Sequence, residues 1–298
     1  MVAPLRLWAF PSNMNFFKKT VAAFREEPTP APMVERFTIY STQLEKEYII
    51  DAYLPGNHRK SQKEKYPFVL FNDGQDLPRM DFENILKKRS EEPEITPCLI
   101  FGIHCNERRI KEYGTARQPD YKGRGHLAPA YTRFILEELL PHLRLRFPLS
   151  NAPESCGIAG FSLGGLSALD IAWAHPEVFG VAGVFSASLW WRSHDVREED
   201  PDADRIMHDI VEKTTYPHPN QRFWFQCGTE DETEDRNHNG VIDSIDDTLD
   251  LIRALRAKGI PDQHIRYLEI EKGRHEPKTW GEAMPDFLRW NADRGTRI

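Results

Sequence analysis

The sequence predicts an α/β fold in which a mostly parallel sheet of eight strands carries helices on both faces. Short, continuous apolar runs alternate with helical segments, which is typical of a parallel sheet covered on both sides. The first two runs instead alternate polar and apolar residues around a short polar turn, as an edge hairpin does. A Gly-x-Ser-x-Gly pattern then joins the fifth run to an Ala/Leu-rich helix, which is typical of a strand-to-helix elbow.

Each predicted strand follows one apolar or alternating run. The strands are Glu35–Ser41, Tyr48–Leu54, Phe68–Phe71, Cys98–Ile103, Cys156–Phe161, Val181–Phe185, Arg222–Cys227 and Ile265–Ile270. Helical periodicity predicts helices at Phe16–Arg25, Pro129–Arg146, Leu166–Ala174, Ile245–Lys258 and Trp280–Trp290. No internal repeat interrupts this order.

The Gly-x-Ser-x-Gly pattern is Gly160-Phe161-Ser162-Leu163-Gly164. At such an elbow the serine is held in a strained turn with its hydroxyl above the sheet. Glycines flank it because side chains would collide with neighbouring backbone. The following helix directs its N-terminus at the serine, where N–H groups favour an oxyanion. The alternative is a Gly-rich turn in which Ser162 serves only as a helix N-cap.

A nucleophilic serine requires a base, and the base requires an orienting acid. In an elbow fold both come later in the chain, each after a further strand, in the order Ser, Asp/Glu, His. Gly228-Thr229-Glu230-Asp231-Glu232 follows the seventh predicted strand, and Gly273-Arg274-His275 follows the eighth. Position singles out His275 among eleven histidines, whereas three consecutive acids compete for the role of the acid.

With these motifs, Val34–Trp290 resembles the putative esterase family of α/β-hydrolases, which includes enterochelin-esterase-like proteins, S-formylglutathione hydrolases and feruloyl esterases. The resemblance also rests on the segments 71–76 and 102–109. It implies an α/β-hydrolase fold in which Ser162 is the nucleophile, Asp231 the acid and His275 the base. It further implies an oxyanion hole made by the backbone N–H of Leu163 and one from the turn after the third strand, assigned to Gln75. Many relatives carry His where Asn72 stands, so that side chain's contacts do not transfer.

Composition agrees with a single globular domain of an ordinary soluble protein, with 40% hydrophobic and 29% charged residues among 298. The net charge of −7 is concentrated in Thr229–Asp247, and the remaining chain is formally neutral. No basic nucleic-acid footprint is present. No run approaches the ~18 apolar residues of a membrane span. The partner expected is therefore a small ester, and the oligomeric state stays open.

Four cysteines lie in or beside apolar strand candidates without C-x-x-C spacing, so buried free thiols are expected: Cys98, Cys105, Cys156 and Cys227. Reduced thiols and the lack of a secretory h-region favour the cytoplasm. Residues 1–33 are expected to form an arm with one short helix and a Pro-rich linker. Residues 34–298 would form the catalytic domain, with an insertion at 235–246.

Two pairs of side chains are candidates for substrate binding near the elbow. Arg108 and Arg109 follow the fourth strand and suit an anionic or polar acyl group, with a structural salt bridge as the alternative. Trp190 and Trp191 follow the sixth strand and suit stacking on a sugar or aryl group, with simple packing as the alternative.

The insertion matches the calcium-binding loop of an EF-hand. An acid stands at position 1, Asn at 3 and 5, Gly at 6 and an acid at 12. The predicted ligands of a structural Ca²⁺ are Asp235, Asn237, Asn239, the carbonyl of Val241, Asp243 and Asp246. Position 12 is Asp rather than Glu, and no helix precedes the loop. The alternative is a solvated acidic loop with Asx turns, in which Ser244 caps the following helix.

These observations favour a serine esterase that hydrolyses a carboxylic ester through an acyl-enzyme, without a cofactor in catalysis. Two alternatives stay open. An acyltransferase would use the same triad with an alcohol in place of water. A non-catalytic binding protein would retain the fold but would not need Ser, Asp and His together at the strand ends.

Overall fold

A computed structural model describes residues 31–56, 58, 65–92, 96–215 and 220–293. Its eight strands are β1 (Met33–Ser41), β2 (Lys46–Leu54), β3 (Phe68–Asn72), β4 (Leu99–Ile103), β5 (Cys156–Phe161), β6 (Val181–Phe185), β7 (Arg222–Glu230) and β8 (Ile265–Arg274). They form a sheet in the order β1-β2-β4-β3-β5-β6-β7-β8. β1 pairs antiparallel with β2, and β2 with β4, whereas all pairs from β4 to β8 are parallel.

The predicted mostly parallel sheet and its edge hairpin are confirmed. β5 and β6 begin and end at the predicted residues. β7 and β8 run further than predicted, to Glu230 and Arg274, because they continue to pair beyond an irregularity next to Gly228. This extension bears on the site, since it carries both strands past the edge at which β5 and β6 end.

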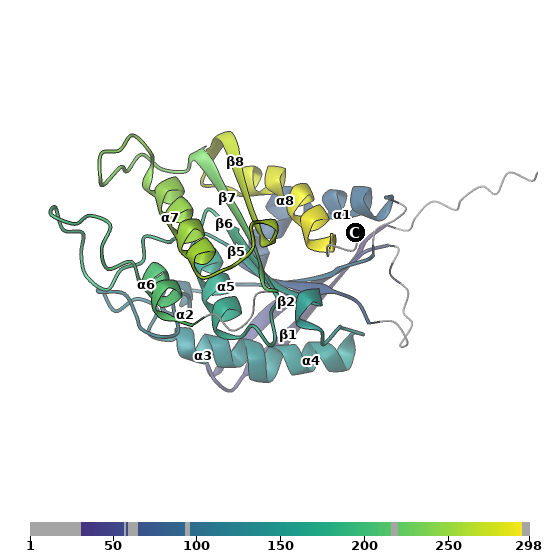
Figure 1. Ribbon diagram of the computed structural model, residues 1–298. Helices are drawn as coiled ribbons and strands as arrows, with labels where there is room; N and C mark the ends of the chain where they lie inside the picture. Colours follow the sequence, from purple (N-terminus) through teal and green to yellow (C-terminus); the bar gives the residue numbers. More distant parts are fainter. Residues whose placement is uncertain (1–30, 57, 59–64, 93–95, 216–219, 294–298) are drawn as a thin grey trace, which may run out of the picture.

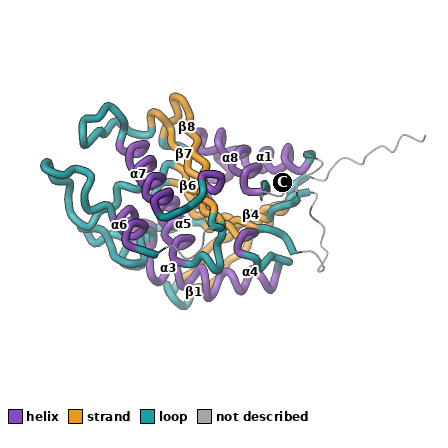
Figure 2. The backbone as a smooth tube through the Cα atoms, in the orientation of Figure 1, coloured by secondary structure: helices purple, strands orange, loops and turns teal. Residues whose placement is uncertain are grey.

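The helices are α1 (Phe82–Ser90), α2 (Arg109–Glu112), α3 (Ala128–Arg133), α4 (Leu140–Arg146), α5 (Leu163–Ala174), α6 (Ile206–Lys213), α7 (Asp243–Ala257) and α8 (Pro277–Ala292). Short helical turns are η1 (Gly74–Met80), η2 (Phe134–Leu139), η3 (Pro153–Ser155) and η4 (Asp262–His264). Figure 1 shows α1 and α8 together on one side of the sheet and α5, α6 and α7 on the other. Figure 2 shows long loops gathered beside α6 and α7.

The helix predicted at Pro129–Arg146 is continuous in space but changes its winding. α3 passes into the π-helical turn η2, and α4 follows with Pro141 in its first turn. Proline has no N–H to donate to the preceding turn, which accounts for a local departure from regular α-helical bonding at this point.

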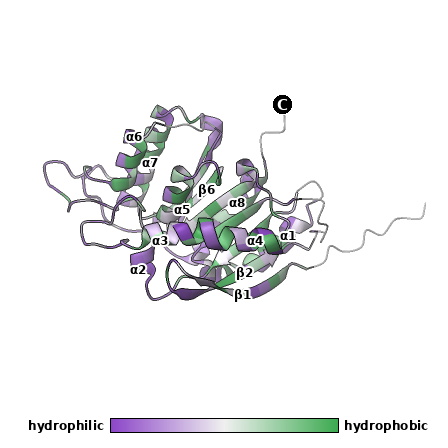
Figure 3. Cartoon of the chain, turned by 90° about the horizontal axis from the view of Figure 1, so that it is seen from below, coloured by the Kyte–Doolittle hydropathy of each residue, from purple (hydrophilic) through white to green (hydrophobic). Residues whose placement is uncertain are grey.

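Two buried clusters lie on opposite faces of the sheet. Successive side chains of β5 point to opposite faces, so Ile158 joins the cluster under α5 and Phe161 joins the one under α8. Phe287 of α8 packs edge-on against Phe71 and Phe185. Figure 3 shows hydrophobic residues along central strands such as β6 and hydrophilic residues along the loops. The sheet is therefore covered on both sides, as predicted.

Some predictions concern the ends and the thiols of the chain. The arm and its helix at Phe16–Arg25 fall mainly on residues 1–30, outside the described residues. All four cysteines are free thiols, as expected; three are buried and Cys105 is half-buried. Among the described helices, none combines the length and the apolar character needed to cross a membrane.

Candidate active site

Three of the predicted site residues each lie one position beyond the end of a strand. Ser162 follows β5, Asp231 follows β7 and His275 follows β8. These strands lie in the same half of the sheet and run parallel, so their carboxyl ends meet at one edge. The fold therefore brings the three residues to a common edge, where ligands bind in open α/β sheets.

Ser162 has the strained backbone of an elbow. Its φ is 55° and its ψ is −124°, a conformation that an L-residue adopts only when its surroundings impose it. Its N–H donates to the carbonyl of Phe185, 2.9 Å away. A Cβ on Gly160 would lie 2.4 Å from the carbonyl oxygen of Gly164, so only glycine fits there. Ser162 is half-buried, and its hydroxyl lies 3.4 Å from that of Ser188.

The turn after β3 is tied directly to the elbow. The buried Asn72 side chain donates to the carbonyl of Gly164 at 2.9 Å and accepts from the Tyr131 hydroxyl at 2.7 Å. The Gln75 side chain accepts the N–H of Cys105 at 3.0 Å, which fixes the first turn of η1. Leu163 is the first residue of α5, so its N–H has no acceptor within that helix. Both predicted oxyanion donors thus belong to turns that are joined at the elbow.

The ladder between β7 and β8 brings the acid loop to the loop that carries the histidine. Glu230 pairs in register with Arg274, immediately before Asp231 and His275. The Lys272 N–H also donates to the Thr229 hydroxyl at 2.7 Å. The proximity of Asp231 and His275 is therefore a consequence of strand pairing.

The side chain of Asp231 is hydrogen-bonded to the backbone of its own turn. One carboxylate oxygen accepts the N–H of Gly228 at 2.9 Å. The other, Oδ1, is buried and has no short hydrogen bond among the described residues. Burial raises the pKa of Asp231, whereas the Gly228 N–H, the Ser186 hydroxyl and the charge of His275 lower it. A buried carboxylate oxygen without a donor calls for a donor from a neighbouring side chain.

The charge of this carboxylate also affects the pKa of His275. Desolvation lowers the pKa of its imidazole, the Asp231 charge raises it, and the Arg109 guanidinium lowers it. The ring lies edge-on to Trp280 of α8, with the centroids 5.4 Å apart. A lowered pKa favours the neutral imidazole, which is the form that accepts a proton.

The two acids that compete with Asp231 are engaged elsewhere. Glu230 forms a solvent-exposed ion pair with Arg274 at 3.1 Å. Glu232 accepts the N–H of Ser244 in the first turn of α7. Burial and nearby acids raise the pKa of Glu232 to about 7. Of the three consecutive acids, Asp231 is the one whose charge acts on His275.

The two predicted arginines have different surroundings. Arg108 pairs with Glu112 at 2.9 Å and donates to the carbonyl of Leu44, which matches the structural alternative. Arg109 forms a bidentate pair with the buried Asp73, with both contacts at 2.7 Å. Asp73 lies against the elbow, because a Cβ on Gly164 would stand 2.4 Å from its Oδ2. Arg109 therefore places a positive charge beside the elbow, and Asp73 pairs with that charge.

The two tryptophans differ in exposure. Trp191 is fully buried, and its ring packs where a Cβ on Gly114 would lie. Trp190 is 36% exposed, which leaves it as the indole that a substrate can reach. The Arg124 guanidinium lies 5.0 Å from the ring centroids of both. The interpretation as simple packing thus describes Trp191, and a substrate contact is open only to Trp190.

The predicted calcium loop turns around its own side chains. Asp235 accepts the N–H groups of Asn239 and Gly240, at 3.1 and 2.9 Å. Asn239 accepts the Val241 N–H at 2.8 Å. Asn237 donates to Asp246 at 2.8 Å, which brings positions 3 and 12 together. Gly240 has a φ of +84°, as the sharp turn at position 6 requires.

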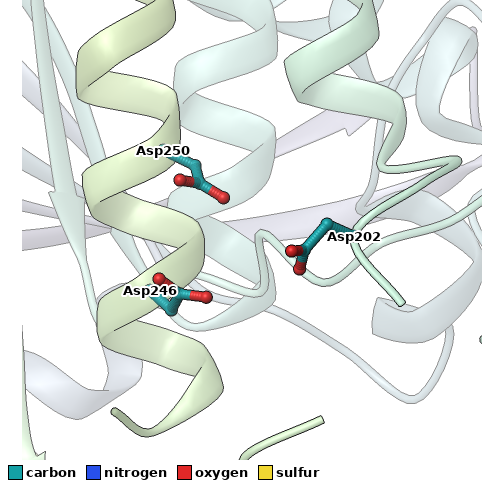
Figure 4. A group of neighbouring side chains, drawn as sticks. All are labelled: Asp202, Asp246 and Asp250. Carbon is teal, nitrogen blue, oxygen red and sulfur yellow. The ribbon is translucent and has the colours of Figure 1, made fainter. Parts of the chain in front are cut away.

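A guanidinium from the same loop lies among its acids. Arg236 is almost fully buried and contacts Asp243 at 3.1 Å, Asp247 at 2.7 Å and Asp202 at 2.6 Å. Asp246 is 3.8 Å from it. In Figure 4, Asp246 and Asp250 project from α7 toward Asp202 on the facing loop. Among the described residues, these three acids have carboxylate oxygens within 4.8 Å of one another, and they share only Asp246 with the predicted ligands.

The helix cap given to Ser244 in the alternative interpretation of this loop is wrong. α7 begins at Asp243, with Ile242 at its N-cap, so Ser244 lies inside the first turn. Its buried hydroxyl has no hydrogen-bond partner among the described residues, and its N–H is satisfied by Glu232. Glu232, in the preceding loop, thus accepts an N–H group of the first turn of α7, which is the role that the sequence analysis gave to Ser244.

Sequence reasoning missed four side chains at this site: Asp73, Ser186, Ser188 and Trp280. One sequence signal was available for Ser186, which directly follows β6 just as Ser162 follows β5. Asp73 also stands directly after β3. The contacts of Trp280 arise from the packing of α8 and have no local sequence signature.

The chain is similar to several known proteins. The Bacillus subtilis protein YbbA is 24% identical over 246 residues, covering 80% of this chain and 90% of its own. The iron(III) enterobactin esterase of Escherichia coli K12 is 36% identical over 143 residues, 46% of this chain and 32% of that protein. The structure of a ferulic acid esterase superposes with a TM-score of 0.66 at 17% identity, covering 89% of this chain and 98% of that one.

The structural likeness shows the α/β-hydrolase fold. A family model described as "Putative esterase" matches residues 41–290, which include every strand end of the site. The chain belongs to this esterase family.

Proposed function

We propose that this protein is a serine esterase in which Ser162, His275 and Asp231 form a catalytic triad. One observation carries the proposal: the strained Ser162 stands at the same sheet edge as Asp231 and His275, which the pairing of β7 with β8 brings together. Family membership supports hydrolysis as the type of reaction.

In this mechanism the neutral His275 takes the Ser162 proton as the hydroxyl attacks the ester carbonyl. Asp231 holds the imidazole tautomer and stabilises the imidazolium. The developing oxyanion accepts the N–H of Leu163 at the α5 N-terminus and that of Gln75. His275 then gives its proton to the leaving alcohol. Water, deprotonated by His275, releases the acid from the acyl-enzyme and restores Ser162.

The first test is loss of activity and of covalent labelling. Ser162→Ala and His275→Ala should lower the turnover of the best ester by ~10⁴-fold, and Ser162→Ala should abolish labelling by a fluorophosphonate. Ser90→Ala is the matched control, because that buried hydroxyl bonds Lys87 on α1, outside the triad and its neighbours. Wild-type turnover in Ser162→Ala would refute the proposal.

The choice of acid is tested by alanine at Asp231 and, separately, at Glu230. Asp231→Ala should cost ~10⁴-fold in kcat, since the pairing of β7 with β8 brings its loop to the loop that carries His275. Glu230→Ala should change kcat by less than about 3-fold, because an exposed ion pair contributes little. A larger loss at Glu230 would move the acid role there.

We propose further that the acyl group is aromatic. The exposed Trp190 stands two residues beyond Ser188, whose hydroxyl is 3.4 Å from that of Ser162. An exposed indole at this place in the chain suits stacking on an aryl group, and a ferulic acid esterase is among the structural neighbours. Trp190→Ala should raise KM for an aryl ester by roughly 10-fold, from ~1–1.5 kcal/mol of stacking, but leave KM for an acetate unchanged. Equal effects on both would contradict an aryl site. Adding an alcohol to the assay reveals any acyl transfer as a new ester.

A further inference from the structure

A fourth side chain occupies the same strand-end position as the proposed triad. The neighbouring parallel strands β5, β6, β7 and β8 end immediately before Ser162, Ser186, Asp231 and His275. Ser186 therefore stands between the nucleophile and the acid along the sheet edge. It is 1% exposed, so its hydroxyl finds its partners inside the protein.

The backbone of Ser186 is held in an unfavourable conformation. Its φ is 43°, in the left-handed region that non-glycine residues rarely adopt. Its N–H donates to the carbonyl of Gln226 on β7 at 2.7 Å, which fixes the residue against the neighbouring strand. Backbone strain of this kind persists where the surrounding structure fixes it, and it concentrates at functional sites.

Trp280 of α8 sets the direction of the Ser186 hydroxyl. The indole Nε1–H lies 3.1 Å from the Ser186 Oγ. An indole nitrogen only donates, so the hydroxyl accepts this bond and keeps its own proton for another acceptor. The same indole stacks on Phe161 with centroids 4.9 Å apart and meets the His275 ring edge-on. One side chain thus contacts both Ser186 and His275.

The remaining acceptor is the acid. Asp231 Oδ1 is buried and has no short hydrogen bond, and an ionised carboxylate accepts but does not donate. Ser186 and Asp231 directly follow β6 and β7, which pair with each other, so the hydroxyl and this carboxyl group belong to neighbouring strand ends. Among the described residues, the Ser186 hydroxyl makes no side-chain hydrogen bond besides the one it accepts from Trp280, so its own proton is free for the Asp231 carboxylate.

We propose that Ser186 is a positioning residue for the acid: its hydroxyl donates to the Asp231 carboxylate, and Trp280 fixes the orientation of that hydroxyl. The inference rests on the proposed triad. The bond would hold the carboxylate rotamer that faces His275 and would favour its ionised form. Neither Ser186 nor Trp280 exchanges protons with the substrate, so both act through Asp231.

The direct test is Ser186→Ala in the full chain, assayed on the best ester. Loss of a hydrogen bond to a charged group should lower kcat by roughly 10–100-fold, with KM unchanged within about 2-fold. Without this donor the Asp231–His275 pair binds its proton more tightly, so the acid limb of the kcat/KM profile should move to higher pH. Ser90→Ala, the buried-hydroxyl control, should move neither.

Two more variants test the link to Trp280. Trp280→Phe keeps a ring beside Phe161 and His275 but removes the N–H, and should lower kcat roughly 3–10-fold. The double variant with Ser186→Ala should match Ser186→Ala alone, because two residues that act through one bond are not additive. Multiplied losses in the double variant would overturn the role given to Trp280.

Ser186→Gly guards against misfolding, since glycine suits a φ of 43° and removes the same hydroxyl. If Ser186→Gly or Ser186→Ala folds with unchanged kcat and pH profile, the proposal is overturned. Fluorophosphonate labelling of the wild type separates this outcome from failure of the proposed function. Absent labelling refutes the esterase, whereas labelling and turnover with an inert Ser186→Ala refute only the positioning role.

Discussion

The elbow at residues 160–165 and the acidic loop at residues 235–246 both match known motifs, yet the structure constrains them differently. At the elbow, backbone atoms stand where side chains would otherwise lie, as around Gly160. In the acidic loop, Gly240 has no atom within 4 Å of a would-be Cβ. The elbow motif therefore has a steric basis, and the loop motif an electrostatic one.

Few residues fit a motif that is defined by close contacts. A motif that is defined by acidic charge requires only a positive charge, which either a metal ion or a basic side chain can supply. Asp243 and Asp246 would suit a hard cation with oxygen ligands. In the structure, the Arg236 guanidinium lies 3.1 Å from Asp243 and 3.8 Å from Asp246. The same acids thus satisfy either interpretation of the sequence. A pattern of charges predicts a binding site less securely than a pattern of close contacts.

The largest effect should come from adding one methyl group to each region. Gly160→Ala places a Cβ 2.4 Å from the Gly164 carbonyl, and we expect it to lower the free energy of unfolding by more than ~3 kcal/mol. Gly240→Ala has space, but its φ of +84° suits glycine, so about 1 kcal/mol is expected. Urea denaturation of both variants measures the difference.

Equal losses in the two variants would remove the distinction between steric and electrostatic motifs. Activity adds a second readout. Folded Gly160→Ala should lose turnover through displacement of Ser162, whereas Gly240→Ala should retain it.

The success of sequence reasoning follows the same division. Apolar runs predicted β5 and β6 to the residue, and the elbow pattern marked Ser162 as the strained turn. Contacts between residues that are far apart in the sequence were not predicted. Arg109 binds Asp73, thirty-six residues away, and Trp280 donates to Ser186, ninety-four residues away. Trp190 and Trp191 have equal local signatures, but only packing decides that one is buried. Local sequence patterns therefore predict strands and helices, whereas the contacts between distant side chains are known only once the fold is known.

The second prediction concerns the cation of the acidic loop. Arg236→Ala leaves several acids without their buried partner, and should lower the free energy of unfolding by ~2–4 kcal/mol. The sequence motif predicts Ca²⁺ binding at the same loop, so millimolar calcium should raise the Tm of Arg236→Ala more than that of the wild type. Calorimetric titration of chelator-stripped protein measures the binding directly.

Arg253→Ala is the matched control, because Arg253 is an exposed arginine on α7 that pairs with Asp250. It should change the Tm little and leave calcium binding as in the wild type. Asp235→Ala, which removes a predicted ligand, should abolish the calcium effect. Absence of binding in both the wild type and Arg236→Ala would leave the guanidinium as the loop's sole cation.

The smallest effect concerns Glu232, which follows Asp231 directly and joins that turn to the first turn of α7 beside the acidic loop. It accepts the Ser244 N–H, and burial with the charges of Asp243, Glu234 and Asp247 raises its pKa from 4.5 to about 7. A raised pKa means that the folded state binds this proton more tightly than the unfolded state. The stabilisation is complete below pH 4.5 and is lost as the pH rises to about 7.

Glu232→Gln keeps an acceptor for Ser244 but cannot ionise, so its stability relative to the wild type should grow between these pH values and level off above them. For a half-buried group, roughly 0.5–1 kcal/mol at pH 8 is expected. Denaturant unfolding of both proteins at pH 4.5, 6 and 8 measures it. A difference in unfolding free energy that stays constant across this pH range would show that the pKa of Glu232 is not raised in the folded protein.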